Sequence, residues 1–162
     1  MQTAGGVTID EAYGIALDTA DNSFTVGYFT GSATFGGSTL TSAGGTDIFL
    51  VKTDDTGNIL WARKAGGSAL DRGLAVATDE AGNCFITGYF NGVADFDGTT
   101  VTSAGSQDAF IAMYNGAGVL QWVERVGGPG SDQGNDIATD HQGNAIFTGE
   151  FRDTADFGTT TL

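Results

Sequence analysis

The sequence is poor in the residue types that carry most catalytic and metal chemistry. It has one cysteine, Cys84, one histidine, His141, and one proline in 162 residues. A single cysteine excludes an intrachain disulfide and a zinc cluster built from cysteines. Nucleophilic catalysis needs a base beside the nucleophile, and one histidine provides little material for it. These shortages predict a protein that is not an enzyme, with His141 in a surface turn.

Positive charge is also scarce. Six Lys and Arg residues against twenty Asp and Glu residues give a formal net charge of −14. Phosphate backbones and anionic lipid surfaces repel such a chain, so we expect neither nucleic acid nor membrane insertion. The sequence has no run of about twenty apolar residues and no charged-then-apolar leader at residues 1–6. An export signal is therefore not expected in this chain.

Glycine, by contrast, is abundant, and paired glycines mark an internal repeat. The chain has 27 glycines. The pairs stand at residues 5–6, 66–67 and 127–128, which are 61 residues apart without a gap. We expect one repeat array over residues 1–162. Its copies cover residues 5–65, 66–126 and 127–162, the last of them incomplete.

Each copy carries the same ordered motifs after its paired glycines. They run A-x-D-x-x-x-N, G-x-F, A-x-F, T-S-A-G and D-x-F and end on a tryptophan, and the first two copies hold the whole set. Because phenylalanines recur in phase, we expect them to form the core. They are Phe29, Phe35, Phe90, Phe96, Phe151 and Phe157.

Turn signals divide the first copy into four expected strands. These lie near residues 13–18, 23–29, 48–52 and 59–63. The first two strands are linked by D-x-x-G-N in the second and third copies, where Gly82 and Gly143 supply the positive φ of a hairpin turn. The first copy has Asp21 at this position, and aspartate tolerates the left-handed region.

Four antiparallel strands per unit at a fixed period predict an all-β fold of β-propeller blades around an axis. The chain would contain about two and a half blades. The period of 61 exceeds the ~40 to 50 residues of familiar propeller repeats. The excess lies between the second and third strands of each copy.

This motif set resembles the bacterial β-propeller repeat family SBBP, and the resemblance covers essentially the whole chain. It implies a secreted or cell-surface β-propeller with no assigned catalytic residues, and it names no ligand. The segment T-G-N-I-L-W at residues 56–61 is also similar to the tryptophan-docking motif of quinoprotein propellers. That likeness implies that Trp61 and Trp122 pack between blades. It does not extend to quinone binding.

Aspartates that recur in phase offer Ca²⁺ binding as an alternative, because oxygen ligands at turns suit this ion. The candidates are Asp10, Asp18, Asp47, Asp71, Asp79, Asp108, Asp132 and Asp140. No segment matches an EF-hand loop or a G-G-x-G-x-D repeat. A turn aspartate that accepts backbone N–H groups explains the recurrence without an ion. We therefore expect no metal and no cofactor.

We expect a non-catalytic, extracellular or cell-surface bacterial protein that acts as a scaffold or a binding or adhesion module, with recognition in the loops of one rim. Its ligand would be a protein or a glycan. An open array leaves strand edges and blade faces uncovered, which favours a homo-oligomer or a longer propeller chain. The alternatives are a Ca²⁺-dependent, lectin-like carbohydrate-binding module, part of a propeller enzyme, and a self-assembling structural protein.

Overall fold

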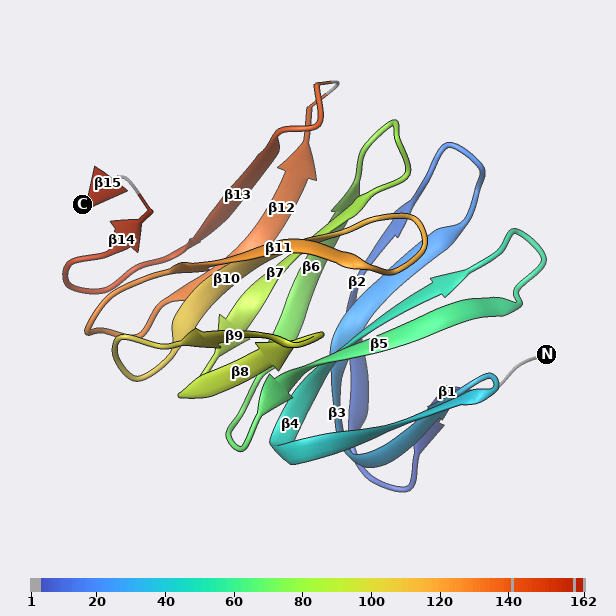
Figure 1. Cartoon of the computed structure of the whole chain (residues 1–162), viewed down its shortest axis with the longest axis horizontal. Coiled ribbons are helices and arrows are strands. Elements are labelled where there is room, and N and C mark those ends of the chain that lie inside the picture. The colour runs from blue at the N-terminus through green and yellow to red at the C-terminus, as the bar shows by residue number, and fades with distance from the viewer. Residues whose placement is uncertain (1–3, 141, 159, 162) are drawn as a thin grey trace.

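The computed structural model describes residues 4–140, 142–158 and 160–161, and its regular structure there is β-strand (Figure 1). Three successive groups of strands, which we call blades 1 to 3, follow the three sequence copies. Blade 1 consists of β2 (Asp10–Leu17), β3 (Ser23–Phe35), β4 (Ser38–Thr53) and β5 (Ile59–Gly67). Blade 2 consists of β6 (Arg72–Thr78), β7 (Cys84–Phe90), β10 (Asp108–Tyr114) and β11 (Leu120–Val126). Blade 3 has β12 (Gln133–Thr139) and β13 (Ala145–Glu150).

Consecutive strands pair antiparallel within blades 1 and 2, from the first strand to the fourth. The predicted all-β fold with four antiparallel strands per blade is therefore confirmed. The described residues include no helix that is long and apolar enough to cross a membrane.

The turns between the first two strands of each blade have the predicted left-handed residue. Its φ is +60° at Asp21, +78° at Gly82 and +80° at Gly143. The side chain of Asp18 accepts the backbone N–H groups of Ala20 and Asn22 at 2.9 and 3.0 Å. Glycine adopts this conformation without a steric penalty, and aspartate is among the few other residues that tolerate it. Figure 1 shows the three hairpin tips along one edge of the molecule.

The residues in excess of a familiar blade form an additional hairpin that pairs with the preceding blade. In the second copy this hairpin is β8 (Val93–Phe96) and β9 (Thr99–Thr102), and β8 pairs with the end of β5. In the first copy the hairpin is continuous with β3 and β4, which pair with each other through it, and its first arm pairs with β1 (Ala4–Gly6). In the third copy it is β14 (Asp156–Phe157) and β15 (Thr160–Thr161).

This hairpin explains why two strands are longer than expected. The second strand, expected to end at residue 29, continues to Phe35, and the third begins at Ser38 instead of residue 48. Periodicity located the extra residues between these strands but did not reveal that they pair. In the first copy the hairpin pairs with β1, and in the second copy it pairs with the end of β5, so in each case the contact joins segments that are distant in the sequence.

The paired glycines allow this contact. A β-carbon on the second glycine of a pair would collide with a backbone carbonyl oxygen of the additional hairpin. The colliding pairs are Gly6 with Ser32, Gly67 with Val93 and Gly128 with Thr154. The first glycine of each pair has a φ between +122° and +144°, a region that L-residues rarely adopt. Both positions therefore require glycine.

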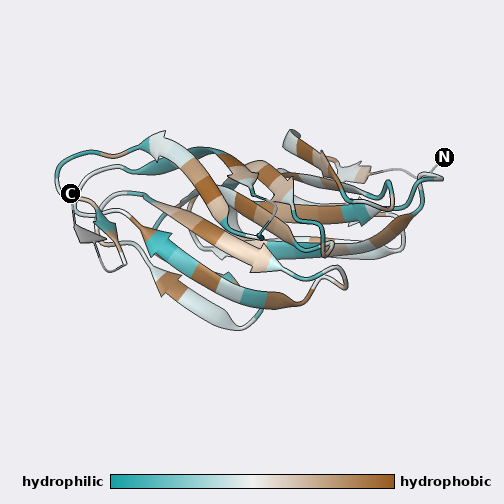
Figure 2. Cartoon of the chain, turned by 90° about the horizontal axis from the view of Figure 1, so that it is seen from above, coloured by the Kyte–Doolittle hydropathy of each residue, from teal (hydrophilic) through white to brown (hydrophobic). Residues whose placement is uncertain are grey.

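The largest core fills the junction between blades 1 and 2. It combines Phe24, Ile48 and Leu50 of blade 1 with Phe90, Phe96, Phe110 and Tyr114 of blade 2. Burial of each phenylalanine contributes roughly 1.5 to 3 kcal/mol. Of the six phenylalanines predicted to be in the core, Phe29, Phe35, Phe90 and Phe96 are buried, and Phe151 and Phe157 in blade 3 are half-buried. Figure 2 shows the apolar residues as brown bands within the strands.

We expect Gly82→Ala to lower the free energy of unfolding by about 1 to 2 kcal/mol, the steric cost of an L-residue in the left-handed region. A β-carbon there meets no described atom within 4 Å, so the loss would come from the backbone alone. Gly37→Ala is the control, because Gly37 is equally open and its φ is not positive. Urea denaturation measures both. Equal losses would contradict the turn geometry.

Candidate functional site

The ends of the three first strands line one groove at the hairpin-tip edge of the blades. Its volume is about 340 Å³. The lining residues are Leu17, Asp18, Thr19, Thr78, Asp79, Glu80, Thr139 and Asp140. We call this surface the rim groove. It is the place where three blades contribute residues of the same phase, and its four carboxylates make it acidic.

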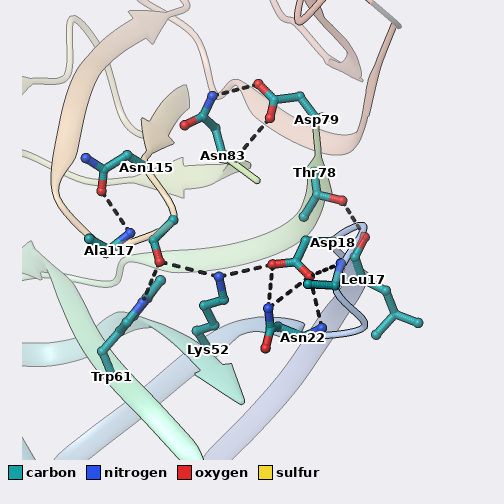
Figure 3. A network of polar contacts seen from close by, with 12 residues as sticks. Leu17, Asp18, Asn22, Lys52, Trp61, Thr78, Asp79, Asn83, Asn115 and Ala117 are labelled. Carbon is teal, nitrogen blue, oxygen red and sulfur yellow. Dashed lines mark hydrogen bonds and ion pairs between the residues drawn. The ribbon is translucent and has the colours of Figure 1, made fainter. Parts of the chain in front are cut away.

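Two side-chain hydrogen bonds hold the three strands together at the rim groove. The hydroxyl of Thr78 donates to the carbonyl oxygen of Leu17 at 2.6 Å, and that of Thr139 donates to the carbonyl oxygen of Thr78 at 2.6 Å. Donor and acceptor are 61 residues apart in both cases. Each bond therefore joins the same position in consecutive blades, and the spacing of β2, β6 and β12 is set directly. Figure 3 shows the first of these bonds.

The aspartates of the rim groove cap their own hairpin turns. Asp79 accepts the backbone N–H of Asn83 at 2.9 Å and its side-chain amide at 2.8 Å. Asp140 makes the same pair of bonds with Asn144 at 2.9 and 2.8 Å. The recurrence of A-x-D-x-x-x-N is thus explained by turn capping, as the sequence predicted.

Asp18 is further stabilised by Lys52, which sequence analysis did not single out. The Lys52 ammonium lies 3.0 Å from Asp18 Oδ2 and is buried with it (Figure 3). Burial opposes ionisation of Asp18, but hydrogen bonds from Asn22 and Lys52 and from the backbone outweigh it and lower the pKa to about 2. The Lys52 ammonium also lies 3.4 Å from the carbonyl oxygen of Gly116 in blade 2. It therefore ties a turn of blade 1 to a turn of blade 2.

Blade 2 has Met113 in the position of Lys52, so this tie belongs to the first junction alone among the described blades. No in-phase repetition could have drawn attention to Lys52. The available signal was a cation in the middle of an apolar strand, between Val51 and Thr53. A buried cation normally requires a charged partner.

Trp61 packs between blades 1 and 2, as its resemblance to a docking motif implied. Its indole N–H donates to the same carbonyl oxygen of Gly116 at 3.2 Å (Figure 3). Its ring lies edge-on to Phe24, with the centroids 5.8 Å apart. A β-carbon on Gly118 would lie 2.8 Å from the indole ring, so the ring covers bare glycine backbone. The implied role of Trp61 is confirmed.

Trp122 has a different environment. It is 37% exposed and packs against Phe85 of its own blade, with ring centroids 6.1 Å apart. It borders a groove of about 520 Å³ between blades 2 and 3. Within the described residues, no turn covers Trp122 as the Gly116–Gly118 turn covers Trp61. The interblade role implied for Trp122 stays a prediction.

The other candidate aspartates lie at the opposite end of the strands and are held by the loops between blades. Asp71 accepts the backbone N–H groups of Gly67 at 2.7 Å and Asn91 at 3.0 Å. Asp132 accepts those of Gly128 and Arg152. Asp10 accepts that of Gly6, Asp47 that of Ala43 and Asp108 that of Ala104. All eight candidates are therefore acceptors for their own turns or loops.

No three His, Cys, Asp or Glu side chains come together as a metal site requires in the part of the chain that the structure describes. The candidates separate into rim aspartates and junction aspartates. Burial raises the pKa of the Cys84 thiol to about 12, which keeps it protonated and unreactive at neutral pH. His141, expected in a surface turn, lies outside the described residues.

We expect Trp61→Ala to destabilise the chain by about 3 kcal/mol, because it removes a large ring from a blade junction. Trp122→Ala is the matched control and should cost clearly less, since its ring is more exposed. Thermal and urea unfolding of both variants measure the difference. Equal losses would contradict the packing of Trp61 against the Gly116–Gly118 turn.

Lys52→Met should lower the free energy of unfolding by about 3 kcal/mol, because it leaves Asp18 buried without its cation. The variant copies the residue found at this position in blade 2. Because the pKa of Asp18 is lowered on folding, its contribution is present above the unfolded-state value of about 4 and is lost as pH falls toward 2. In Lys52→Met this acid loss should begin at higher pH. An unchanged acid profile would argue against the ion pair.

Comparison with known proteins supports the repeat interpretation. The model of the SBBP family, a β-propeller repeat, matches residues 121–149, which run from β11 into β13. The uncharacterized WD repeat-containing protein L264 of Acanthamoeba polyphaga mimivirus is 28% identical over 115 residues, 60% of this chain and 8% of that protein. Regulatory protein FlaEY of Caulobacter vibrioides is 28% identical over 99 residues, 59% of this chain and 10% of that protein.

The matched region thus spans a tenth or less of the length of these two relatives. The family match covers the last strand of one blade and the first two of the next, and the same motifs recur in phase through the other copies. The segment 121–149 is therefore similar to an SBBP β-propeller repeat, and the motifs that recur in phase extend this likeness to the other copies.

Proposed function

We propose that this chain is a non-catalytic, extracellular β-propeller repeat module that holds a binding surface, the rim groove, on a rigid scaffold. The placement outside the cell follows from what the SBBP resemblance implies. The small share of each relative that the matched region covers fits a module within larger proteins. The scaffold role is supported by the in-phase residues, which serve turns and blade junctions.

The observation that carries the proposal is the contrast between backbone and side chains at the rim groove. Interblade hydrogen bonds and turn caps fix the backbone there in all three blades. The side chains nevertheless differ between copies. Leu17 of the first copy corresponds to Thr78 and Thr139 of the other two, and Thr19 corresponds to Glu80. A rigid frame with unlike side chains gives a surface that is not repetitive. Such a surface suits recognition of one partner.

The charge of the rim groove sets the class of partner. Asp18, Asp79, Glu80 and Asp140 line it, so a polyanion would be repelled and a cationic or neutral polar segment accepted. The proposed ligand is accordingly a protein segment or a glycan without acidic groups.

Peptide and glycan arrays probed with the purified chain test the proposal. Glu80→Lys and Thr19→Lys should each lower the affinity for a retained ligand about tenfold or more, because both exposed positions border the rim groove. Gln121→Lys adds one positive charge on exposed β11, as Thr19→Lys does at the rim groove, and should leave binding unchanged. Equal effects of all three variants, or turnover of a substrate by the purified chain, would contradict the proposal.

A further inference from the structure

Two buried carboxylates lie next to each other at the junction of blades 1 and 2. Asp47 is on β4, Asp71 is in the loop between β5 and β6, and both are 0% exposed. A β-carbon on Gly66 would lie 2.9 Å from Asp47 Cγ and 2.9 Å from Asp71 Oδ2. The residues are held there by Thr46, whose carbonyl oxygen accepts the Asp71 N–H at 2.8 Å and whose hydroxyl donates to the Asp71 carbonyl oxygen at 3.2 Å.

The two carboxylates differ in their supply of hydrogen-bond donors. Each carboxylate oxygen of Asp71 has a hydrogen-bond donor, because Oδ2 accepts the N–H of Gly67 and Oδ1 accepts that of Asn91. Asp47 Oδ2 accepts the N–H of Ala43 at 3.0 Å and lies 3.5 Å from the Lys64 ammonium. Asp47 Oδ1 is buried and has no hydrogen-bond partner among the described residues. A buried anionic oxygen without a donor is costly, and a proton on it removes that cost.

The surrounding elements supply too little positive charge for two anions. From β5, Lys64 faces Asp47, but its side chain is 40% exposed. From β6, Arg72 stacks over Tyr28, with 4.2 Å from the guanidinium carbon to the ring centroid. Tyr89 on β7 is uncharged at neutral pH. On β8, the backbone of Asp95 is opposite Gly66 in the strand pair, but its side chain is exposed. The carboxylate of Asp95 accepts the N–H of Gly98.

We infer that Asp47 and Asp71 form a proton-sharing pair, so that this blade junction binds one proton from solvent, on Asp47 Oδ1, and becomes more stable as pH falls from neutral to mildly acidic. Two buried carboxylates that both border Gly66 cannot both be ionised cheaply in a dry site. The proton neutralises Asp47, and Asp71 keeps the two backbone N–H groups that its carboxylate accepts.

The pKa shifts agree with the geometry. Burial raises the pKa of Asp47, against the hydrogen bond from Ala43 and the charge of Lys64. Burial also raises the pKa of Asp71 to about 6, and the charge of Asp47 adds to it. The pKa of each carboxyl group is raised on folding, so the folded chain binds more protons than the unfolded chain above about pH 4, and for Asp71 this range extends to about pH 6. The junction is therefore destabilised as pH rises through this range and regains stability as pH falls.

A second pair in the same phase provides a comparison within the molecule. Asp108 and Asp132 approach each other across Gly127, and Asp108 Oδ1 likewise has no partner among the described residues. Here the Arg125 guanidinium lies 2.8 Å from Asp108 Oδ2, closer than Lys64 lies to Asp47. A fixed guanidinium compensates a carboxylate better than a half-exposed lysine does. The pair at the second junction therefore has a closer and more firmly placed cation than the pair at the first.

Asp47→Asn tests the inference, because the amide imitates the protonated carboxyl. Its oxygen can accept the N–H of Ala43, and its NH₂ group supplies the hydrogen that the Oδ1 position lacks. Thermal unfolding is measured from pH 5.0 to 7.5 in EDTA at constant ionic strength. Wild type should melt at least about 3 °C higher at pH 5.0 than at pH 7.5. Asp47→Asn should melt above wild type at pH 7.5 and lose this pH dependence.

Asp55→Asn is the charge-matched control, since it removes one negative charge from an exposed turn and should keep the wild-type slope. Every variant keeps the one histidine of the sequence, so the comparison between variants cancels any contribution from that residue type, which ordinarily titrates in this range. If Asp47→Asn does not fold, infrared difference spectra of wild type between the two pH values replace it. A protonated carboxyl band at pH 5.0 that is absent at pH 7.5 supports the pair.

Three results would overturn the inference. The first is that the melting temperature of Asp47→Asn changes with pH as much as that of wild type. The second is a variant less stable than wild type at pH 7.5. The third is a rise in the melting temperature of wild type, but not of Asp47→Asn, when CaCl₂ replaces EDTA at pH 7.5. That result would assign the unpartnered oxygen to a bound cation instead of a proton.

Discussion

The contact on which the rest of the structure depends is the pairing of one blade's fourth strand with the next copy's additional hairpin. The end of β5 pairs with β8 at Gly66 and Gly67, and no residue with a β-carbon fits where Gly67 meets the carbonyl of Val93. The hairpin thereby fixes blade 2 against blade 1. The core between the blades, the docking of Trp61 and the approach of Asp71 to Asp47 all require this placement.

The two ends of each blade serve different purposes as a result. At the hairpin-tip end, aspartates such as Asp18 and Asp79 are satisfied by their own turns, and the rim groove carries side chains that differ from blade to blade. At the other end, carboxylates from two blades are buried together with limited compensation. In our proposals, one end provides the recognition surface, and the other makes the stability of the array sensitive to protons.

Much of the fold was predictable because the period of 61 residues applies the same local demands in every copy. The four main strands of blades 1 and 2, the turn positions and the left-handed conformation of Asp21 and Gly82 follow from nearby residues. The role of Lys52 was not predictable, since the residue is not repeated and its partners lie in a turn of its own blade and in a turn of the next. The length of β3 was underestimated because its last residues pair with a segment that precedes the blade.

The sequence by itself determined the class of fold, the repeat period and the glycine and aspartate positions, because each depends on backbone conformation or hydrogen bonding within a few residues. Only the tertiary structure decided which side chains meet between blades. Asp47 and Asp71 are 24 positions apart and belong to different copies, and nothing in their local sequence distinguishes a turn cap from half of a buried pair. Their proximity arises from how one sheet packs on the next, which is a property of the assembled blades.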